Sequence, residues 1–297
     1  MSFNNIITVI PTFFDNNNNI DFNGINNHIE KQIEMGIKTI IILGTTSETP
    51  TLTKNEKLFI VNSVYKKFNS NLKIIIGISG NETTSVIDEC NTYSLYGDGY
   101  MISAPYYNKP SQEGLYQHFQ KIIKSTNKNI ILYNVPSRCG VNIEPETIAR
   151  IHNNFPQVVA IKEASGSIEQ VIKIKTLSSI NIYSGDDGLT LPFMSIGAIG
   201  VISVISNICA KEMINMIDEF TKGNIANATK IFYDINPLIK LAFIESNPVP
   251  IKYLINKLNT ALSEEVRLPL VELTNSNKLI IDNWLNKNTE FKIKHFK

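Results

Sequence analysis

A lysine that ends an apolar stretch is the first residue of this chain whose position suggests covalent chemistry. Lys162 follows residues 158–161, a short run rich in the β-branched side chains that form buried strands. Burial disfavours the charged ammonium and lowers the pKa of a lysine, and a neutral lysine can attack a ketone to form an imine. The ordinary alternative is a strand-end lysine that reaches back to solvent, so imine chemistry requires partners elsewhere in the chain.

Other side chains that can move protons or hold carboxylates also follow apolar runs. Tyr133 ends the run before that of Lys162, and its phenol can shuttle protons, although a core tyrosine with a satisfied hydroxyl is equally common. Arg138 can hold a carboxylate through two parallel hydrogen bonds, with a surface salt bridge as the alternative. Thr45 and Thr46 lie in a tight turn that can offer N–H groups and hydroxyls to a small carboxylate, or serve as a turn alone.

Neither the acids nor the histidines and cysteines show the spacing of a metal site. Asp186 and Asp187 are adjacent acids without further ligands, and we interpret them as acceptors that fix a loop. The 4 histidines are scattered, so we expect no zinc site. The 3 cysteines are also scattered and odd in number, which favours a reduced compartment without a disulfide framework.

The composition limits the class of protein and of partner. A chain of 297 residues, 43% of them hydrophobic, can bury a large core in one domain or two. The net charge of +1 argues against nucleic acid or an anionic membrane as the main partner. No apolar run approaches the roughly 20 residues of a membrane span, and residues 1–5 show no basic start of a secretory signal. We therefore expect a cytoplasmic protein with no membrane or nucleic-acid partner.

Eight short β-type runs alternate with stretches long enough to form helices. The runs cover residues 6–11, 39–43, 73–76, 100–104, 129–133, 158–161, 181–183 and 198–205. This alternation predicts a parallel sheet, and eight units in about 220 residues favour a closed (β/α)8 barrel, a TIM barrel, over an open doubly wound sheet. No Gly-x-Gly-x-x-Gly motif follows any run, which argues against a dinucleotide fold.

Local signals mark the helices between and after these strands. Asp21 can cap a first helix that ends at Gly36, Thr53 and Glu56 form a capping-box pattern, and Pro145 suits a first helical position. After the eighth run the pattern becomes all-helical, at residues 210–222, 224–245, 250–259 and 276–286. We therefore expect a catalytic barrel in residues 1–223 and a C-terminal helical domain in residues 224–297.

A barrel gathers the residues that end its strands, because active sites of such barrels lie at the carboxyl ends of the strands. The strand ends carry Gly44-Thr45-Thr46-Ser47-Glu48, Pro105-Tyr106-Tyr107-Asn108, residues 133–138, Lys162, residues 184–187 and residues 200–203. Hydroxyls, phenols and charges are therefore expected together at one rim. This rim is the predicted active site.

Together these motifs resemble the dihydrodipicolinate synthase family of the class I aldolase superfamily, which includes N-acetylneuraminate lyase. The matching segments are residues 44–48, 105–115, 133–138, 161–166, 184–187, 200–204 and 245–252, and the resemblance runs from about residue 7 to about residue 270. It implies a pyruvate-dependent lyase of the Schiff-base type. The implied reaction condenses pyruvate with L-aspartate-4-semialdehyde, the first committed step of lysine (diaminopimelate) biosynthesis, and requires no metal or organic cofactor.

The resemblance implies a role for each matching residue of the relay. Lys162 matches the lysine that forms the imine with pyruvate, and Tyr133 matches the proton donor and acceptor. Thr45 and Tyr107 match the other members of a hydroxyl relay with Tyr133. In the family the residue at Tyr107 comes from a neighbouring subunit, and the family forms homotetramers of two tight dimers.

The remaining matches concern substrate binding. Thr46 and Ile202 match positions that hold pyruvate, partly through backbone groups. Arg138 matches the arginine that binds the carboxylate of aspartate semialdehyde, and Gly185 matches a backbone position near the substrate. Arg138 and the pair Glu163-Ala164 that follows Lys162 resemble the synthases more than the sialic acid lyases. Two alternatives stay open at this point, a related lyase acting on a sugar acid and a catalytically idle barrel used for ligand sensing or assembly.

The chain departs from the family at the carboxylate-binding turn. The family commonly has glycine where this chain has Ser47. If that position requires a positive φ, serine costs about 1 kcal/mol or more there and shifts the amides of Thr45 and Thr46. We therefore expect an effect on pyruvate affinity.

A second departure concerns feedback inhibition by lysine. Asn81 and Tyr106 match members of the family's allosteric lysine site. Where lysine-sensitive members carry histidines and a glutamate, this chain has Lys54, Lys57 and Ser85. Two cations and a missing acid disfavour a cationic effector, so we predict weak or absent inhibition by lysine.

Overall fold

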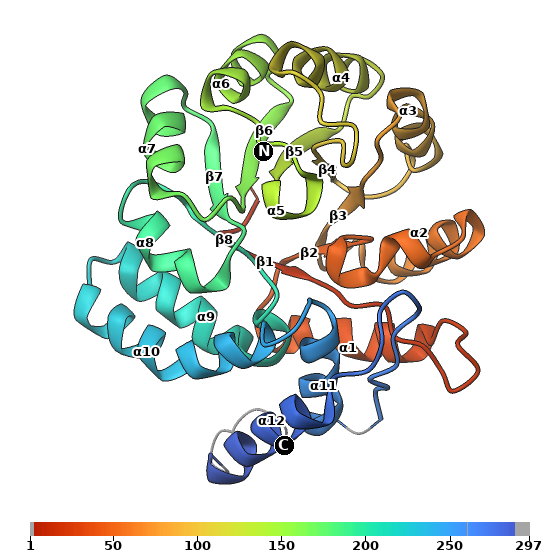
Figure 1. Ribbon diagram of the computed structural model, residues 1–297, viewed down its shortest axis with the longest axis vertical. Helices are drawn as coiled ribbons and strands as arrows, with labels where there is room; N and C mark the ends of the chain where they lie inside the picture. Colours follow the sequence, from red (N-terminus) through yellow and green to blue (C-terminus); the bar gives the residue numbers. More distant parts are fainter. Residues whose placement is uncertain (1–2, 260, 289–297) are drawn as a thin grey trace. The chain divides into compact units, whose positions relative to one another are not determined.

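Within residues 3–259 and 261–288, the part of the chain that the computed structural model describes, eight strands close into one barrel (Figure 1). The strands are β1 (Ile6–Val9), β2 (Thr39–Ile42), β3 (Lys73–Ile78), β4 (Gly99–Ser103), β5 (Asn129–Asn134), β6 (Val158–Glu163), β7 (Asn181–Ser184) and β8 (Gly200–Ser203). They follow one another around the barrel in sequence order, and the pairs from β2 to β8 are parallel. The predicted (β/α)8 barrel is confirmed.

The strands consist of buried isoleucine, valine and other apolar side chains because both faces of a parallel barrel are covered. One glycine is required for the barrel to close. A Cβ atom on Gly200 would lie 1.7 Å from the backbone oxygen of Asn5. Only glycine therefore lets β8 approach the segment that precedes β1, where Val201 N of β8 donates a hydrogen bond to Asn5 O over 2.9 Å.

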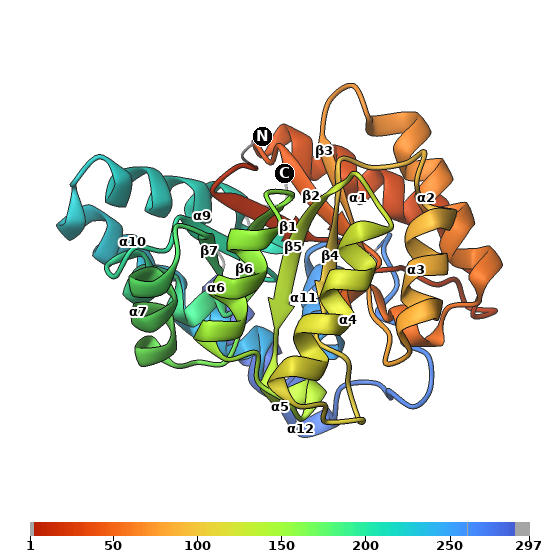
Figure 2. The same cartoon turned by 90° about the horizontal axis from the view of Figure 1, so that it is seen from above.

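Helices cover the outer side of strands β3 to β7 (Figure 1). They are α3 (Thr83–Thr92), α4 (Gln112–Lys124), α6 (Pro145–Asn154) and α7 (Ile168–Leu177). The short helix α5 (Pro136–Cys139) follows β5, and the 3-10 turn η3 (Asp187–Leu189) and the short helix α8 (Thr190–Met194) follow β7. Figure 2 shows α5 beyond the tip of β5, at the carboxyl end of that strand.

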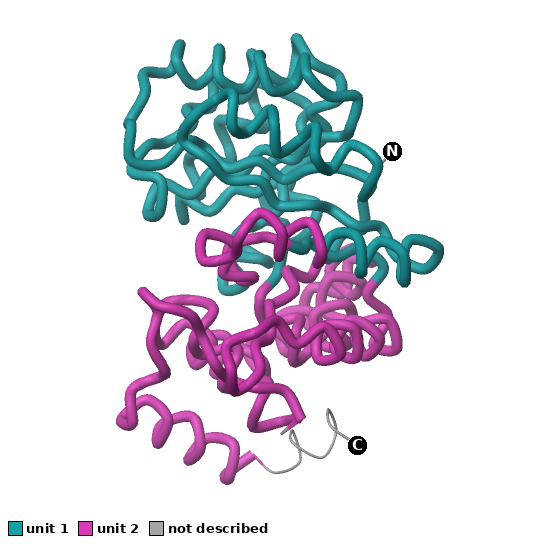
Figure 3. Tube along the Cα trace, turned by 90° about the vertical axis from the view of Figure 1, so that its right-hand side faces the viewer, with its two compact units in different colours: residues 1–7, 38–42, 61–203 teal, residues 8–37, 43–60, 204–297 magenta. Residues whose placement is uncertain are grey.

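The chain forms two compact units (Figure 3). The first comprises residues 1–7, 38–42 and 61–203, and the second comprises residues 8–37, 43–60 and 204–297. The second unit contains α1 (Phe22–Glu34), the 3-10 turns η1 (Thr45–Ser47) and η2 (Thr49–Thr51), α9 (Ser206–Thr221), α10 (Ile225–Ala242), α11 (Val249–Leu258) and α12 (Asn275–Lys287), while α2 (Lys54–Phe68) passes from one unit into the other. The C-terminal helices predicted from the sequence are therefore present, and the domain boundary at residue 223 stays a prediction.

The predicted helix starts are confirmed by their hydrogen bonds. The Asp21 carboxylate accepts from Gly24 N over 2.8 Å at the start of α1. Thr53 and Glu56 form the reciprocal capping box, with 2.7 Å from Thr53 N to Glu56 Oε2 and 3.2 Å from Glu56 N to Thr53 Oγ1. Pro145 opens α6. No helix in the described ranges is long and apolar enough to cross a membrane.

Candidate active site

Lys162 lies on β6 between two tyrosines of the neighbouring strands. The strand register pairs it with Tyr133 of β5 on one side and with Tyr183 of β7 on the other. Lys162 is only 5% exposed, and its Nζ atom lies 4.7 Å from the centre of the Tyr133 ring. The sequence predicted this neighbourhood from the order of the strands, and the structure places both side chains on the same face of the sheet.

The surroundings of Lys162 favour its neutral form. Burial lowers the pKa of the amine from 10.5 to about 8. The Asp187 carboxylate opposes this shift and the Arg138 guanidinium adds to it. With a pKa of about 8, roughly a tenth of the amine is neutral at pH 7, compared with less than about one part in a thousand for an ordinary lysine. The amine can therefore act as a nucleophile near neutral pH.

The two acids after β7 have different environments. The Asp186 carboxylate accepts from Gly188 N over 2.8 Å, which confirms its predicted role in fixing the loop. Asp187 is 1% exposed and acts electrostatically on Lys162, a role that the sequence analysis missed. The position of Asp187 just after β7, the strand next to that of Lys162, could have indicated this role. An ionised group there partly offsets the cost of charging Lys162.

Arg138 is held on α5, which is fastened to the loop after β4. The Cys139 thiol donates to Ala104 O over 3.2 Å, and Tyr107 N donates to Cys139 O over 3.3 Å. The Arg138 side chain itself is exposed, yet its charge affects Lys162. The structure thus brings Arg138, Tyr133 and Lys162 together in the first unit, as the strand-end argument predicted.

Tyr107 does not join this group within one chain. It is 87% exposed and has a left-handed backbone, with φ 70°. Its neighbour Tyr106 is 41% exposed, and Lys109 also has a positive φ, 46°. Non-glycine residues pay free energy for this conformation. The loop therefore presents the Tyr107 phenol outward.

Thr45 and Thr46 form the 3-10 turn η1 in the second unit, directly after β2 in the chain. Thr46 is 1% exposed, and its Oγ1 accepts from Asn247 Nδ2 over 3.0 Å, a contact that the sequence analysis missed. Asn247 belongs to the C-terminal segment that resembles the family, and that resemblance was the only available signal. The turn is therefore tied to a residue about 200 positions away in the sequence.

The expectation of strain at Ser47 is wrong. Around this turn the positive φ angles fall on Leu43 (55°) and Glu48 (54°), and Ser47 has an ordinary 3-10 backbone. The Ser47 hydroxyl donates to Ile10 O over 2.6 Å, in buried surroundings. Serine therefore adds a hydrogen bond to the turn, where the sequence suggested a steric cost.

Of the two remaining binding residues, Gly185 directly follows β7 and Ile202 lies on the neighbouring strand β8. Gly185 N donates to Glu163 O over 2.8 Å, so this amide is already engaged. A Cβ atom on Gly185 would lie 2.5 Å from the Cβ of Ala164, which makes glycine necessary at this close approach. Ile202 lies on β8 and is 1% exposed.

Comparison with known proteins identifies the family. The model of the dihydrodipicolinate synthetase family matches residues 2–288. A 4-hydroxy-tetrahydrodipicolinate synthase from Methanococcus maripaludis is 43% identical over 270 residues, which cover 91% of this chain and 93% of that protein. The chain belongs to the dihydrodipicolinate synthetase family. The family predicted from the sequence motifs is therefore confirmed.

Solved structures agree with this membership of the dihydrodipicolinate synthetase family. A crystal structure of a dihydrodipicolinate synthase superposes with a TM-score of 0.94 at 37% identity and covers 97% of this chain and 100% of its own. A chloride-inhibited dihydrodipicolinate synthase from Acinetobacter baumannii, complexed with pyruvate, superposes with a TM-score of 0.91 at 32% identity, covering 96% and 98%. The match extends over both the barrel and the C-terminal helices.

A buried polar network behind Lys162 was not predicted from the sequence. The Glu163 carboxylate accepts from the side-chain amides of Asn134 (3.0 and 3.1 Å) and Gln170 (2.9 Å) and from Ser165 N (2.8 Å). Burial raises the pKa of Glu163, and these donors oppose the rise. Because side chains alternate along a strand, Glu163 points away from the face that carries Lys162. The network joins the ends of β5 and β6 to α7 and so fixes the strand end that holds the lysine.

The residues of the expected lysine-binding site lie in different units. Asn81 O accepts from Asn108 Nδ2 over 2.8 Å in the first unit, which links it to the loop of Tyr106. Ser85 donates through its N–H and its hydroxyl to the Glu82 carboxylate. Lys54 and Lys57 lie on α2 in the second unit. The weak response to lysine stays a prediction.

Proposed function

We propose that this chain is a 4-hydroxy-tetrahydrodipicolinate synthase that joins pyruvate to L-aspartate-4-semialdehyde through an imine on Lys162. The observation that carries the proposal is the buried amine of Lys162, with its pKa lowered to about 8, beside the Tyr133 ring. Curated relatives with this activity, matched over nine-tenths of the chain, support the assignment. The reaction is the first committed step of lysine biosynthesis by the diaminopimelate route, and a cytoplasmic location stays a prediction.

The proposed reaction begins with attack of the neutral Lys162 Nζ on the ketone carbon of pyruvate. The ketone oxygen leaves as water, and the protonated imine withdraws electrons from the neighbouring methyl group. That methyl group loses a proton to form an enamine, whose carbon attacks the aldehyde of the second substrate. The substrate amine then attacks the former ketone carbon and releases Lys162. The Tyr133 phenol donates and accepts the protons of these steps in this proposal, which is supported by the 4.7 Å between Lys162 Nζ and the centre of the Tyr133 ring.

The two substrate carboxylates have separate binding groups in this proposal. The turn of Thr45 and Thr46 holds the carboxylate of pyruvate, since the first N–H groups of a 3-10 turn have no partner within the turn. Ile202 and Gly185 line the same substrate. The exposed Arg138 guanidinium binds the carboxylate of aspartate semialdehyde with two parallel hydrogen bonds. Two anionic substrates suit a site whose exposed charge is an arginine.

We also propose that Tyr107 acts in the active site of a second copy of the chain. Tyr107 is 87% exposed and lies on a strained loop. Exposing a large aromatic side chain on a strained backbone costs free energy, which favours a function for this side chain. Together with the family resemblance, this exposure supports a homotetramer made of two tight dimers. Tyr133, Tyr107 and Thr45 then form the relay that carries protons to and from the imine.

The proposal is tested by turnover with two electrophiles. The purified chain is incubated with pyruvate and either L-aspartate-4-semialdehyde or N-acetylmannosamine. We expect consumption of pyruvate only with the semialdehyde, because Arg138 suits a carboxylate and a neutral sugar does not require it. An Arg138→Ala variant is expected to lose semialdehyde turnover while still forming the imine with pyruvate. Turnover of the sugar in place of the semialdehyde would refute the assignment.

A further inference from the structure

A buried ion pair joins the C-terminal helices to the turn of Thr45 and Thr46, both in the second unit. Lys252 on α11 donates from Nζ to Glu48 Oε1 over 2.8 Å and to the backbone oxygen of Glu265. Both side chains of the pair are 0% exposed. Burial lowers the pKa of Lys252, and the Glu48 charge opposes that shift. Because both charges are fully buried, the pair does not contribute to the solubility of the chain, and another role must explain it.

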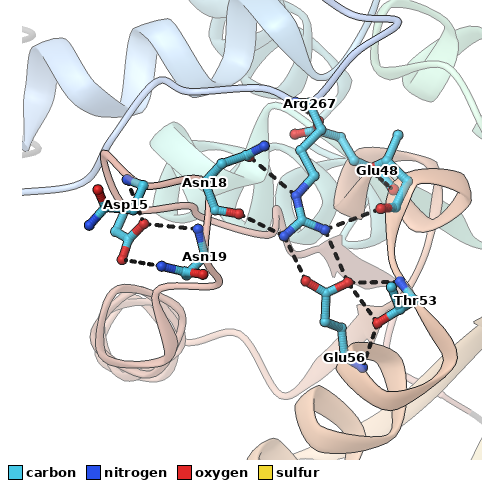
Figure 4. Close-up of polar contacts among 9 residues, drawn as sticks. Asp15, Asn18, Asn19, Glu48, Thr53, Glu56 and Arg267 are labelled. Atoms are coloured by element: carbon cyan, nitrogen blue, oxygen red, sulfur yellow. Dashed lines mark hydrogen bonds and ion pairs between the residues drawn. The ribbon is translucent and has the colours of Figure 1, made fainter.

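Arg267 completes the cluster from the segment that follows α11. Its backbone N–H donates to Glu48 Oε2 over 2.9 Å, so each oxygen of that carboxylate has its own donor. Its guanidinium donates to both oxygens of Glu56 (2.6 and 3.1 Å) and to the backbone oxygens of Thr51 (3.1 Å) and Asn18 (2.7 Å). Figure 4 shows the Arg267 side chain lying between Asn18 and Glu56. Lys252 and Arg267 therefore hold residues 48–56 through Glu48, Thr51 and Glu56.

Residues 48–56 begin with Glu48, a strained residue that ends the Thr45–Ser47 turn. Glu48 has a left-handed backbone, with φ 54° and ψ 34°, and it is both the end of η1 and the start of η2. Its N–H donates to Thr45 O over 3.1 Å, and its own backbone oxygen accepts from Thr51 N over 2.9 Å. Glutamate adopts this conformation only where its surroundings determine it, so the ion pair fixes the backbone that ends the Thr45–Ser47 turn.

The ion pair between Lys252 and Glu48 contributes to the conformation of the turn more than to the stability of the fold. Replacing a buried ion pair by apolar side chains of similar volume is often neutral or stabilising, so we infer that this pair serves to select one conformation of the turn. Both cations also lie over the buried ring of Phe14, at 4.5 Å for Lys252 Nζ and 4.4 Å for Arg267 Cζ. The position of the Glu48 carboxylate is thereby set by the C-terminal part of the chain.

We propose that Lys252 and Arg267 are positioning residues for the binding of an α-keto acid carboxylate, and that they act through Glu48 on the Thr45–Ser47 turn. This inference rests on the proposed role of Thr45 and Thr46 in holding pyruvate. It assigns a function in substrate affinity to the C-terminal helices, which contribute none of the groups that form the imine.

The test measures pyruvate affinity apart from imine chemistry. Lys252→Met, Glu48→Gln and the double variant are treated with borohydride over a range of pyruvate concentrations, and the adduct on Lys162 is followed by mass. We expect the half-saturating pyruvate concentration to rise about tenfold in each single variant, while saturating pyruvate still labels every chain. The effects in the double variant are expected to be less than additive, because both substitutions break one interaction.

Two further variants keep the test decisive if a core substitution unfolds the chain. Glu56→Gln weakens the cluster at its half-buried end, where the Glu56 side chain is 25% exposed, and is expected to raise the half-saturating pyruvate concentration less than the core variants do. Lys278→Met is the matched control. It removes two ion pairs, with Glu264 and Glu272, whose members all lie outside residues 45–56, and it should leave half-saturation unchanged.

A second readout separates this inference from the proposed function. In a Lys162→Met background no imine can form, and the rise in melting temperature caused by pyruvate reports carboxylate binding alone. The Glu56→Gln substitution should reduce that rise, and Lys278→Met should not. A wild-type chain that forms no adduct overturns the imine chemistry, while the melting shift still tests the turn. Folded Glu48, Lys252 and Glu56 variants with wild-type half-saturation and wild-type melting shifts overturn the inference.

Discussion

At the scale of single residues, the reactivity of Lys162 follows from the cost of keeping it charged. Its Nζ lies over the Tyr133 ring with only 5% of the residue exposed, so water solvates the ammonium poorly. The Asp187 carboxylate limits the effect and holds the pKa at about 8, where the amine is partly neutral yet an imine is readily protonated. Burial therefore makes Lys162 nucleophilic and also lowers the stability of the folded chain, because the charged form is poorly solvated.

The pH dependence of pyruvate capture follows from this pKa. The ratio kcat/KM for pyruvate should rise about tenfold per pH unit below pH 8 and level off above it, because it reports ionisation of the free enzyme. An Asp187→Asn variant should move the midpoint to lower pH, since the carboxylate raises the pKa of Lys162. A wild-type midpoint near 10.5, the ordinary value for lysine, would show that the amine is not shifted.

The stability of the chain should improve when Lys162 is replaced by methionine. The folded-state pKa of about 8 lies below the ordinary 10.5, so the unfolded chain binds the proton more tightly and the folded chain pays the full cost below pH 8. Lys162→Met should raise the free energy of unfolding at pH 7 by about 1–3 kcal/mol, measured by urea denaturation. The gain should shrink as the pH rises from about 8 toward 10.5, and a gain independent of pH would contradict this account.

At the scale of elements, the strands and most helices were predictable because burial repeats along each of them. Each β-run is apolar since both faces of a parallel barrel are covered. The starts of α1 and α2 carry caps that depend on three or four neighbouring residues, and a proline opens α6. The four-residue helix α5 has no such period. The pairing of Glu48 with Lys252 spans 204 positions, and charge alone does not select a partner over that distance.

The turn after β2 allows a test of the Ser47 hydroxyl. Ser47→Gly removes the buried hydrogen bond to Ile10 O and adds freedom to the unfolded chain, without relieving any positive φ. We expect the free energy of unfolding to fall by about 1–2 kcal/mol and the half-saturating pyruvate concentration to rise. Tighter pyruvate binding by the glycine variant would mean that serine strains the turn after all.

At the scale of the whole molecule, family membership was predictable because the site residues stand at strand ends in a fixed order along the chain. The positions of Lys162, Tyr133 and Arg138 within one unit follow from that order. The hydrogen-bond network of Glu163 with Asn134 and Gln170 could not be predicted from that order, because amide side chains at strand ends are common in barrels. For Tyr107 the family resemblance alone suggested a role in a neighbouring subunit, and its 87% exposure in the single chain agrees with a shared active site.

Sharing of the site between subunits predicts complementation. Tyr107→Phe chains lack the shared phenol, and Lys162→Met chains lack the amine, so each variant alone should have little activity. Mixed dimers contain one site with an intact Lys162 and an intact Tyr107 from the partner, and activity should return when the two variants are unfolded together and refolded. Mixtures that stay as inactive as the separate variants would show that Tyr107 serves its own chain or none.

The central claim is that Lys162 forms an imine with pyruvate, and reductive trapping tests it most directly. The chain is incubated with pyruvate and borohydride, digested, and its peptides are analysed by mass. We predict one stable adduct per chain, located on Lys162, with turnover of L-aspartate-4-semialdehyde lost in proportion to labelling. Full turnover of the semialdehyde by a chain that carries no adduct on Lys162 would contradict the account.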